Sequence, residues 1–288
     1  MKLTYPISIE SLINSKLWLL GIASGLMAIH LTLTWRAEDS SLWGVSALFW
    51  IAVGSLMWSK RDSLILDSDV FSSFFGTFLI SVILLKSLFL SGYDPFLRIY
   101  PCLSALSIAL LASGFNGLKQ YWRELLILCF IAPSPGVLSL LLDISLLTAQ
   151  FATALLWYLG FNVARQGVYI FLPTSLVEVY SGCSGIESML QLLGLALVFL
   201  MMFPTNRIEK VIVPVIASLI AFVVNGVRVA VLATLASPST QIAFDYWHKG
   251  DGSLLFSMLA VLIFGLFCFF LLRFNEPDNH DPMESQEP

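Results

Sequence analysis

The stretch from Val211 to Ala236 reads VIVPVIASLIAFVVNGVRVAVLATLA, and it decides the class of fold. An apolar run of this length can cross the hydrocarbon core of a bilayer as a helix, which needs about 20 residues. The rest of the chain is similar, since 58% of its residues are hydrophobic, 12% are charged and the mean hydropathy is +0.86. Its long apolar runs lack the period-2 alternation of a transmembrane barrel. The sequence therefore predicts an all-α, polytopic transmembrane helical bundle.

About eight membrane spans are predicted, joined by short loops. They cover residues 17–35, 42–58, 70–90, 100–115, 125–160, 185–203, 211–236 and 254–274. The stretch 125–160 is interrupted by Pro133, Ser134, Pro135 and Gly136, so it is either a re-entrant half followed by a crossing or one kinked helix. Residues 1–274 are expected to form a single integral membrane domain, and the acidic residues 275–288 a disordered cytoplasmic tail.

The basic residues of the loops predict the orientation, because cytoplasmic loops carry an excess of Lys and Arg. With the N-terminus in the cytoplasm, nine fall inside: Lys2, Lys16, Lys60, Arg61, Lys119, Arg123, Arg207, Lys210 and Arg273. Four fall outside, namely Arg36, Arg98, Arg165 and Lys249, while Lys86 and Arg228 lie within spans. We therefore expect a multi-pass protein of the cytoplasmic (inner) membrane, with residues 160–184 and the loop around residue 248 on the periplasmic or exterior face.

Cys183 stands where one of these outer segments enters a span. In the segment before it, residues 168, 170 and 172 are apolar, and residues 177 and 179 are apolar after a Pro-Thr-Ser turn. This alternation predicts a small outward-facing hairpin, with an ordinary interfacial loop as the alternative. Ser184 and Glu187 predict a capping box that places the thiol beside free backbone N–H groups and the positive end of a helix dipole. Such a setting favours the nucleophilic thiolate and can hold an oxyanion.

Two structural roles also remain open for Cys183. It can be a small packing residue, as we predict for Cys129 and Cys268 in their apolar runs. It can also form a disulfide with Cys102, which lies near the outer end of its span.

Arg228 lies inside the apolar run quoted above. An arginine at a helix centre costs roughly 2.5 to 3.5 kcal/mol on insertion scales, so it needs a partner or a water-filled cavity. It lies about 25 Å along the helix, toward the outer surface. Asn225 precedes it by three residues and shares its face. Arg228 would therefore bind a substrate carboxylate or stabilise a tetrahedral intermediate, unless it snorkels from the lipid face to the headgroups.

His248 occurs in YWHKGDGS, residues 246–253, in the outer loop before the last span. An imidazole titrates near neutral pH, so it can deprotonate a thiol or protonate a leaving amine. Gly250 and Gly252 would let the loop bend toward the site. His30, in the outer half of the first span, is the reserve candidate for the base, whereas His280 lies in the tail on the opposite side.

Taken in order, three motifs resemble the signature of the exosortase and archaeosortase family of transmembrane proteins. They are Cys183-Ser-Gly-Ile at a helix start, Asn225-x-x-Arg228 one helix later and His248-x-x-x-Gly252 before the last helix. They lie within residues 163–254, and the break at Pro133-Ser-Pro135 is also similar to that family. The aromatic content and the Ser-Gly-Ile-Glu block resemble its cyanobacterial branch.

The resemblance implies a membrane cysteine protease or transpeptidase that cleaves C-terminal sorting signals of PEP-CTERM type during protein export. By the same resemblance Cys183 is the nucleophile, Arg228 the family's arginine and His248 the general acid or base. Four neighbours are expected to support them: Ser184, Gly185, Asn225 and Gly252.

The expected partners are the sorting-signal helix of an exported protein, membrane lipids, and a lipid or glycan acceptor for the Cys thioester. We expect no cofactor, no metal and no nucleic acid, because the cysteines lack zinc spacing and no Gly-rich phosphate motif follows a strand. A small transporter or flippase is an alternative, with Arg228, Lys86, Asp143 and Glu187 lining a polar path, and a noncatalytic export assembly factor is another. The sequence lacks the internal repeat common in secondary transporters, which disfavours the first alternative.

Overall fold

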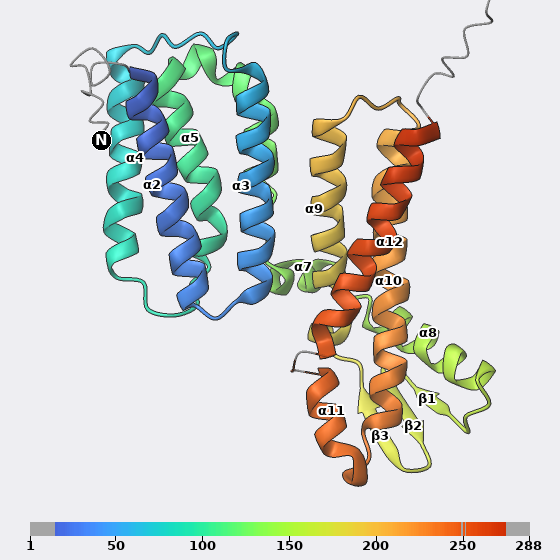
Figure 1. Cartoon of the computed structure of the whole chain (residues 1–288). Helices are drawn as coiled ribbons and strands as arrows, with labels where there is room; N and C mark the ends of the chain where they lie inside the picture. Colours follow the sequence, from blue (N-terminus) through green and yellow to red (C-terminus); the bar gives the residue numbers. More distant parts are fainter. Residues whose placement is uncertain (1–14, 249, 251, 275–288) are drawn as a thin grey trace, which may run out of the picture. The chain divides into compact units, whose positions relative to one another are not determined.

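The computed structural model describes residues 15–248, 250 and 252–274 (Figure 1). The chain divides into two compact units, one of residues up to 140 together with 200–204, and one of residues 141–199 and from 205 onward. Helices make up almost all of the described elements, and the predicted all-α class is confirmed. The predicted tail, residues 275–288, lies outside the described residues.

Unit 1 is a bundle of long apolar helices. Its main helices are α2 (Ser15–Arg36), α3 (Ser40–Lys60), α4 (Val70–Leu88) and α5 (Phe96–Gly117), which lie side by side in Figure 1. The carboxylates of Asp39 and Asp69 accept hydrogen bonds from the amides of Leu42 and Ser72, at 2.8 Å and 3.1 Å, so they cap the N-termini of α3 and α4. These caps explain why α3 and α4 begin where the apolar runs begin.

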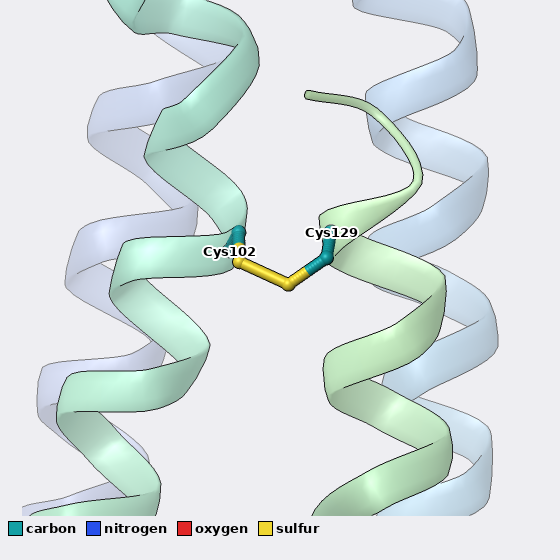
Figure 2. The surroundings of a disulfide bond; sticks show 2 residues. All are labelled: Cys102 and Cys129. Carbon is teal, nitrogen blue, oxygen red and sulfur yellow. A yellow bond between two sulfur atoms is a disulfide. The ribbon is translucent and has the colours of Figure 1, made fainter. Parts of the chain in front are cut away.

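The chain folds back on itself within the last turn of α5, at Gly114. This glycine has a φ of +63°, a left-handed conformation that interrupts the helix. A short 3₁₀ turn η1 (Leu118–Tyr121) then leads into α6 (Trp122–Cys129). A straight helix would separate Cys102 from Cys129 by about 40 Å. Instead their Cα atoms are 4.6 Å apart and a disulfide joins them, with α5 and α6 on opposite sides of the bond (Figure 2).

This disulfide corrects two cysteine predictions. Cys129 is not a simple packing residue, and Cys102 is not the partner of Cys183, which is a free thiol. Cys268 is free and buried, as predicted for a packing residue.

The stretch predicted at 125–160 is divided twice, so it is not one kinked helix. After α6 the chain breaks at the predicted prolines, and α7 (Pro135–Leu141) starts with a proline at its first position, where the missing N–H costs nothing. The Ser134 hydroxyl accepts a hydrogen bond from the Val137 amide at 3.2 Å. A second break follows before α8 (Ser145–Tyr158), where Asp143 accepts from the Ser145 amide at 2.9 Å. Helices α7 and α8 are bent by 90° relative to each other.

Six helices among the described residues are long and apolar enough to cross a membrane, or seven if α7 and α8 count as one broken span. The prediction was about eight. Two predicted spans account for the difference: 185–203 corresponds to α9 (Ile186–Met202), which has only 17 residues, and 125–160 corresponds to the bent pair α7 and α8, which counts at most once. The chain is a multi-pass membrane protein.

Unit 2 combines helices with a small antiparallel sheet. The strands β1 (Ala164–Gln166), β2 (Tyr169–Leu172) and β3 (Ser175–Glu178) lie in the order β1-β2-β3. Leu172 pairs with Ser175 across a two-residue turn, so the predicted hairpin is confirmed. Its inward side chains, Ile170 and Val179, are fully buried against α8 and α10 (Glu209–Leu235). Strand β1 was not anticipated, because its three residues are all exposed and show no alternation.

Three short elements complete unit 2 around the end of α10. A 3₁₀ turn η2 (Ser181–Cys183) precedes α9, and the 3₁₀ turn η3 (Pro238–Thr240) leads into α11 (Gln241–His248). The last helix, α12 (Gly252–Phe274), packs against α10 and α11. In Figure 1 the sheet, α11 and the start of α12 gather at the same end of unit 2.

Candidate active site

The turn that carries Cys183 is closed by its own backbone. The amides of Cys183 and Ser184 donate to the carbonyl groups of Tyr180 and Ser181, at 2.8 Å and 3.3 Å. The Ser184 hydroxyl also donates to the Ser181 carbonyl, at 2.7 Å, and receives only a 3.5 Å contact from the Ile186 amide. The predicted capping box with Glu187 is therefore wrong, and the two amides nearest the thiol are already engaged.

Cys183 and His248 face each other. The Cys183 Sγ lies 3.6 Å from the His248 Nε2, within hydrogen-bond distance of a thiol and an imidazole. His248 is the last residue of α11, so it stands on a helix and not in the predicted loop. The Phe244 ring, one turn earlier, lies 5.0 Å from the imidazole and supports its orientation.

Two polar residues of α10 bind the segments that carry this pair. The Asn225 amide nitrogen donates to the Cys183 carbonyl at 3.0 Å, and the Arg228 Nη2 donates to the His248 carbonyl at 3.1 Å. Because the two residues are nearly one turn apart, they bond both segments from a single face of α10. This arrangement agrees with the predicted shared face, and it places Arg228 in the site and not toward lipid.

The Arg228 guanidinium keeps capacity for a further ligand. Its Nε is buried and has no hydrogen-bond partner. Within the described part of the chain no carboxylate forms an ion pair with Arg228, and Asp251 lies outside that part. A cation with a buried, unbonded N–H group suits an anionic or developing negative charge on a substrate.

Close packing explains two of the predicted supporting glycines. Gly185 has a φ of +98°, and a Cβ there would lie 2.7 Å from the Asn225 amide nitrogen. A Cβ on Gly252 would lie 2.8 Å from the Trp247 ring. Gly252 therefore lets α12 pack against α11, whereas the sequence suggested a bend. Ser184 is fully buried, and its carbonyl accepts from Thr148 at 2.7 Å, which fixes the turn to α8.

Tyr180 was missed by the sequence analysis, although it stands only three residues before the cysteine. Its ring covers Gly182, where a Cβ would lie 2.6 Å from a ring carbon. Interaction with the Cys183 thiol, first through a hydrogen bond and then through charge, raises the pKa of the Tyr180 phenol, while the charge of Arg228 opposes the rise. The phenol therefore stays protonated beside the sulfur and can donate to a thiolate.

A cavity of about 170 Å³ opens beside this group. Residues 176–180 form one wall, Cys183 and His248 lie in the lining, and apolar side chains of α10 and α11, such as Val229 and Phe244, complete it. A cavity of roughly 150 Å³ accommodates a benzene-sized group, so this one has room for an apolar side chain next to the thiol.

His30, the reserve candidate for the base, is fully buried in unit 1. Its Nε2 bonds the Leu97 carbonyl at 2.9 Å, and the Trp50 indole donates to its Nδ1 at 3.2 Å. Indole nitrogen is only a donor, so Nδ1 accepts and Nε2 carries the hydrogen. Both ring nitrogens are thus used inside the bundle, and His30 no longer qualifies as the base.

The fold and the site together define a multi-pass helical membrane protein that gathers a thiol, an imidazole and a guanidinium at one end of one unit. The family described as transmembrane exosortase matches residues 35–265, which is most of the chain, and the chain belongs to that family. Members of this family are sorting-related transmembrane transpeptidases, and the resemblance predicted from the three motifs is confirmed. Neither a curated protein nor a solved structure matches the chain.

Proposed function

We propose that this exosortase cleaves C-terminal sorting signals of PEP-CTERM type from exported proteins through a thioester on Cys183. The observation that carries the proposal is the 3.6 Å contact between the Cys183 sulfur and the His248 Nε2, beside an arginine with no carboxylate partner among the described residues. Family membership supports the same class of reaction.

The reaction begins with proton transfer from the Cys183 thiol to His248. The sulfur then attacks the carbonyl carbon of the scissile peptide bond, and the oxygen becomes a tetrahedral oxyanion. Arg228 is the group proposed to stabilise this charge, because the amides of Cys183 and Ser184 are already bonded within their turn. When the C–N bond breaks, His248 returns its proton to the departing amine and the acyl group remains on sulfur. A hydroxyl or amine of a lipid or glycan, or water, then gives a proton to the neutral His248 and attacks the thioester, and the C–S bond breaks to release the thiolate.

The charge distribution of unit 2 supports placing this site at the outer face of the cytoplasmic membrane. Arg228 lies about 28 Å along α10 from Glu209, which starts that helix. The basic residues Arg207, Lys210 and Arg273 all lie at the opposite end of α10 or α12. Because basic residues favour the cytoplasmic side, the thiol would face the periplasm or exterior.

Unit 1 shows the same separation of charge. Lys60 pairs with Glu124 at 2.8 Å, which brings the loop after α3 to the turn before α6, where Lys119 and Arg123 lie. At the other end of the bundle Arg98 and Lys86 are each balanced by an aspartate, Asp39 at 3.9 Å and Asp94 at 3.2 Å, and Arg36 forms no ion pair with a described residue. The end with more basic residues outside ion pairs, that of Lys119 and Arg123, is the one we place in the cytoplasm.

A transporter or flippase is less well supported by the contacts. Two of the four residues predicted to line a polar path have local partners: Lys86 pairs with Asp94 at 3.2 Å, and Asp143 accepts from the Ser145 amide at 2.9 Å. Charged side chains that pair with neighbours at helix ends are stabilised there, so they do not indicate a shared polar path through the bilayer.

Coexpression with a reporter tests the proposal. The reporter is an exported domain that ends in a recognition segment, an apolar helix and a basic cluster, and mass spectrometry maps its new C-terminus. Cleavage should occur with the wild type and disappear in Cys183→Ala and Cys183→Ser. The matched control is Cys268→Ala, which removes the other free cysteine, buried in α12, and should cleave like the wild type. Full cleavage by Cys183→Ala would refute the proposal.

A further inference from the structure

Strand β3 has a free edge beside the candidate nucleophile. The sheet order β1-β2-β3 leaves one side of β3 without a neighbouring strand. The Val179 amide donates to the Val168 carbonyl at 3.0 Å, and these two residues are directly opposite in the register. Hydrogen-bonded and non-hydrogen-bonded pairs alternate in an antiparallel ladder, so Tyr169 and Glu178, like Phe171 and Leu176, form non-hydrogen-bonded pairs.

The main-chain groups of Leu176 and Glu178 consequently point away from β2. No residue of the described part of the chain bonds to the N–H or C=O group of either one. Such an edge is a template for another extended chain, which would lie about 4.8 Å away. A folded protein usually blocks a strand edge of this kind, so an unblocked edge indicates a binding site for another extended chain.

The free edge continues directly to the thiol. Residues 176–180 line the cavity of about 170 Å³ together with Cys183 and His248. Tyr180 keeps an extended backbone, with φ −87° and ψ 172°, up to the turn that carries Cys183. The apolar side of the cavity, formed by Val229 and Leu232 of α10 among others, offers a place for one side chain of the occupant.

We infer that the substrate polypeptide binds as an added strand on the free edge of β3, in the extended segment that precedes its membrane helix. This inference rests on the proposed function, because the occupant is the chain that Cys183 cleaves. Main-chain hydrogen bonds to Leu176 and Glu178 hold the segment and align it with the sulfur. An apolar side chain next to the scissile bond enters the cavity, and alternate side chains of the segment point away from it.

The test removes one main-chain donor and keeps the rest of the strand. Glu178→Pro deletes the outward N–H group, and the ladder with β2 does not use this group. Glu178→Ala is the matched control, because it loses the same side chain and keeps the N–H group. We expect kcat/KM for the reporter to be about tenfold lower in the proline variant than in the alanine variant, mainly through KM, because the two variants share the lost side chain and differ in the N–H group. Alkylation of Cys183 by iodoacetamide should remain at the wild-type rate in both variants.

A proline scan of the reporter gives a second measurement with the wild-type enzyme. Proline placed through the segment before the reporter's membrane helix should impair cleavage at alternate positions, since only every second residue directs its N–H group to β3. If Glu178→Pro also slowed alkylation of Cys183, the variant would have disturbed the cysteine site itself, and the proline scan alone would test the added-strand inference. Equal cleavage by the proline and alanine variants, or a scan without alternation, overturns the added-strand inference. Cleavage by Cys183→Ala would overturn the proposed function instead.

Discussion

Two histidines, one in each unit, show how differently the same side chain is used. His30 in unit 1 is fully buried, and the Leu97 carbonyl and the Trp50 indole engage both of its ring nitrogens. His248 in unit 2 directs its Nε2 at the Cys183 sulfur, and both line an open cavity. Saturated hydrogen bonding makes the first a structural residue, whereas the second keeps a nitrogen in contact with a reactive atom.

The basic residues repeat this difference. In unit 1 Lys60 pairs with Glu124 at 2.8 Å and also donates to the Gln120 carbonyl. In unit 2 Arg228 bonds a carbonyl with Nη2 and leaves its Nε without a partner. The Lys60 ammonium in unit 1 is thus bonded to neighbouring groups inside a bundle, while the Arg228 guanidinium of the cysteine site retains an N–H group for a ligand. The environment of a residue, more than its type, therefore separates a structural role from a chemical one.

The largest effect should come from the two histidines. His248→Ala should lower reporter cleavage by about 10²- to 10⁴-fold, the usual contribution of a general acid or base, with little change in thermal stability. His30→Ala should instead lower thermal stability with little change in cleavage, because it leaves the Trp50 donor and the Leu97 carbonyl unpaired. Its thermal midpoint in detergent should fall by several degrees, with cleavage per folded molecule retained. Equal loss of cleavage activity in both variants would contradict the assignment of His248 to the chemistry and of His30 to the structure.

The two basic residues provide the next comparison. Arg228→Gln should lower cleavage by about 10²- to 10³-fold if the guanidinium stabilises the oxyanion. Lys60→Met should leave cleavage intact and destabilise the fold, because the nearly buried Glu124 carboxylate loses its ion-pair partner. The double variant Lys60→Met/Glu124→Gln should recover stability, as measured by thermal unfolding. Wild-type cleavage by Arg228→Gln would exclude the arginine from the chemistry.

The order of predictable features follows the physical strength of each signal. Length and hydropathy predicted six of the eight spans as the structure has them, and alternating residues around Pro173 and Thr174 predicted the hairpin. The position of Arg228 near one end of its span predicted its place at the end of α10 where Cys183 and His248 lie. The reversal between the spans predicted at 100–115 and 125–160 was expected, but its left-handed backbone at Gly114 was not, because membrane helices tolerate glycine. The disulfide of Cys102 with Cys129 was missed because it depends on how α5 and α6 align side by side, which no local pattern specifies.

Local details of the site depended on tertiary packing. The eight residues of α11 would be a marginal helix alone, and packing against α10 and α12 stabilises them. The Ser184 hydroxyl could bond either the Ser181 carbonyl or the backbone of a capping box with Glu187. In the structure it donates to the Ser181 carbonyl and closes the turn. The proximity of Tyr180 to Cys183 required the turn geometry, which no motif encodes.

Glycines give a smaller effect. Gly185→Ala should lower cleavage by about tenfold or more, because its φ of +98° disfavours a side chain and a Cβ would lie 2.7 Å from the Asn225 amide nitrogen. Gly54→Ala, on an open face of α3 with no atom within 4 Å of the new Cβ, should be neutral. Initial cleavage rates at matched expression compare the two. A neutral Gly185→Ala would show that the turn tolerates displacement.

The smallest effect concerns Tyr180. Tyr180→Phe should slow alkylation of Cys183 at neutral pH by about threefold, because the thiolate loses a hydrogen-bond donor. The control Tyr246→Phe, on α11, should leave the rate unchanged. The pKa of Tyr180 is raised above its ordinary value, so the phenol is protonated below that value and loses its proton only at higher pH. The wild type should therefore keep its faster alkylation relative to Tyr180→Phe between pH 7 and about 9.

Trapping of the acyl group tests the central claim most directly. Hydroxylamine added to membranes that cleave the reporter should attack the Cys183 thioester, release the thiolate and leave a hydroxamate at the new C-terminus, detected by mass spectrometry. We predict the hydroxamate with the wild type and Cys268→Ala, and its absence with Cys183→Ala. Reporter cleavage by the wild type that never yields a hydroxamate, together with equal cleavage by Cys183→Ala, would contradict the thiol–imidazole site.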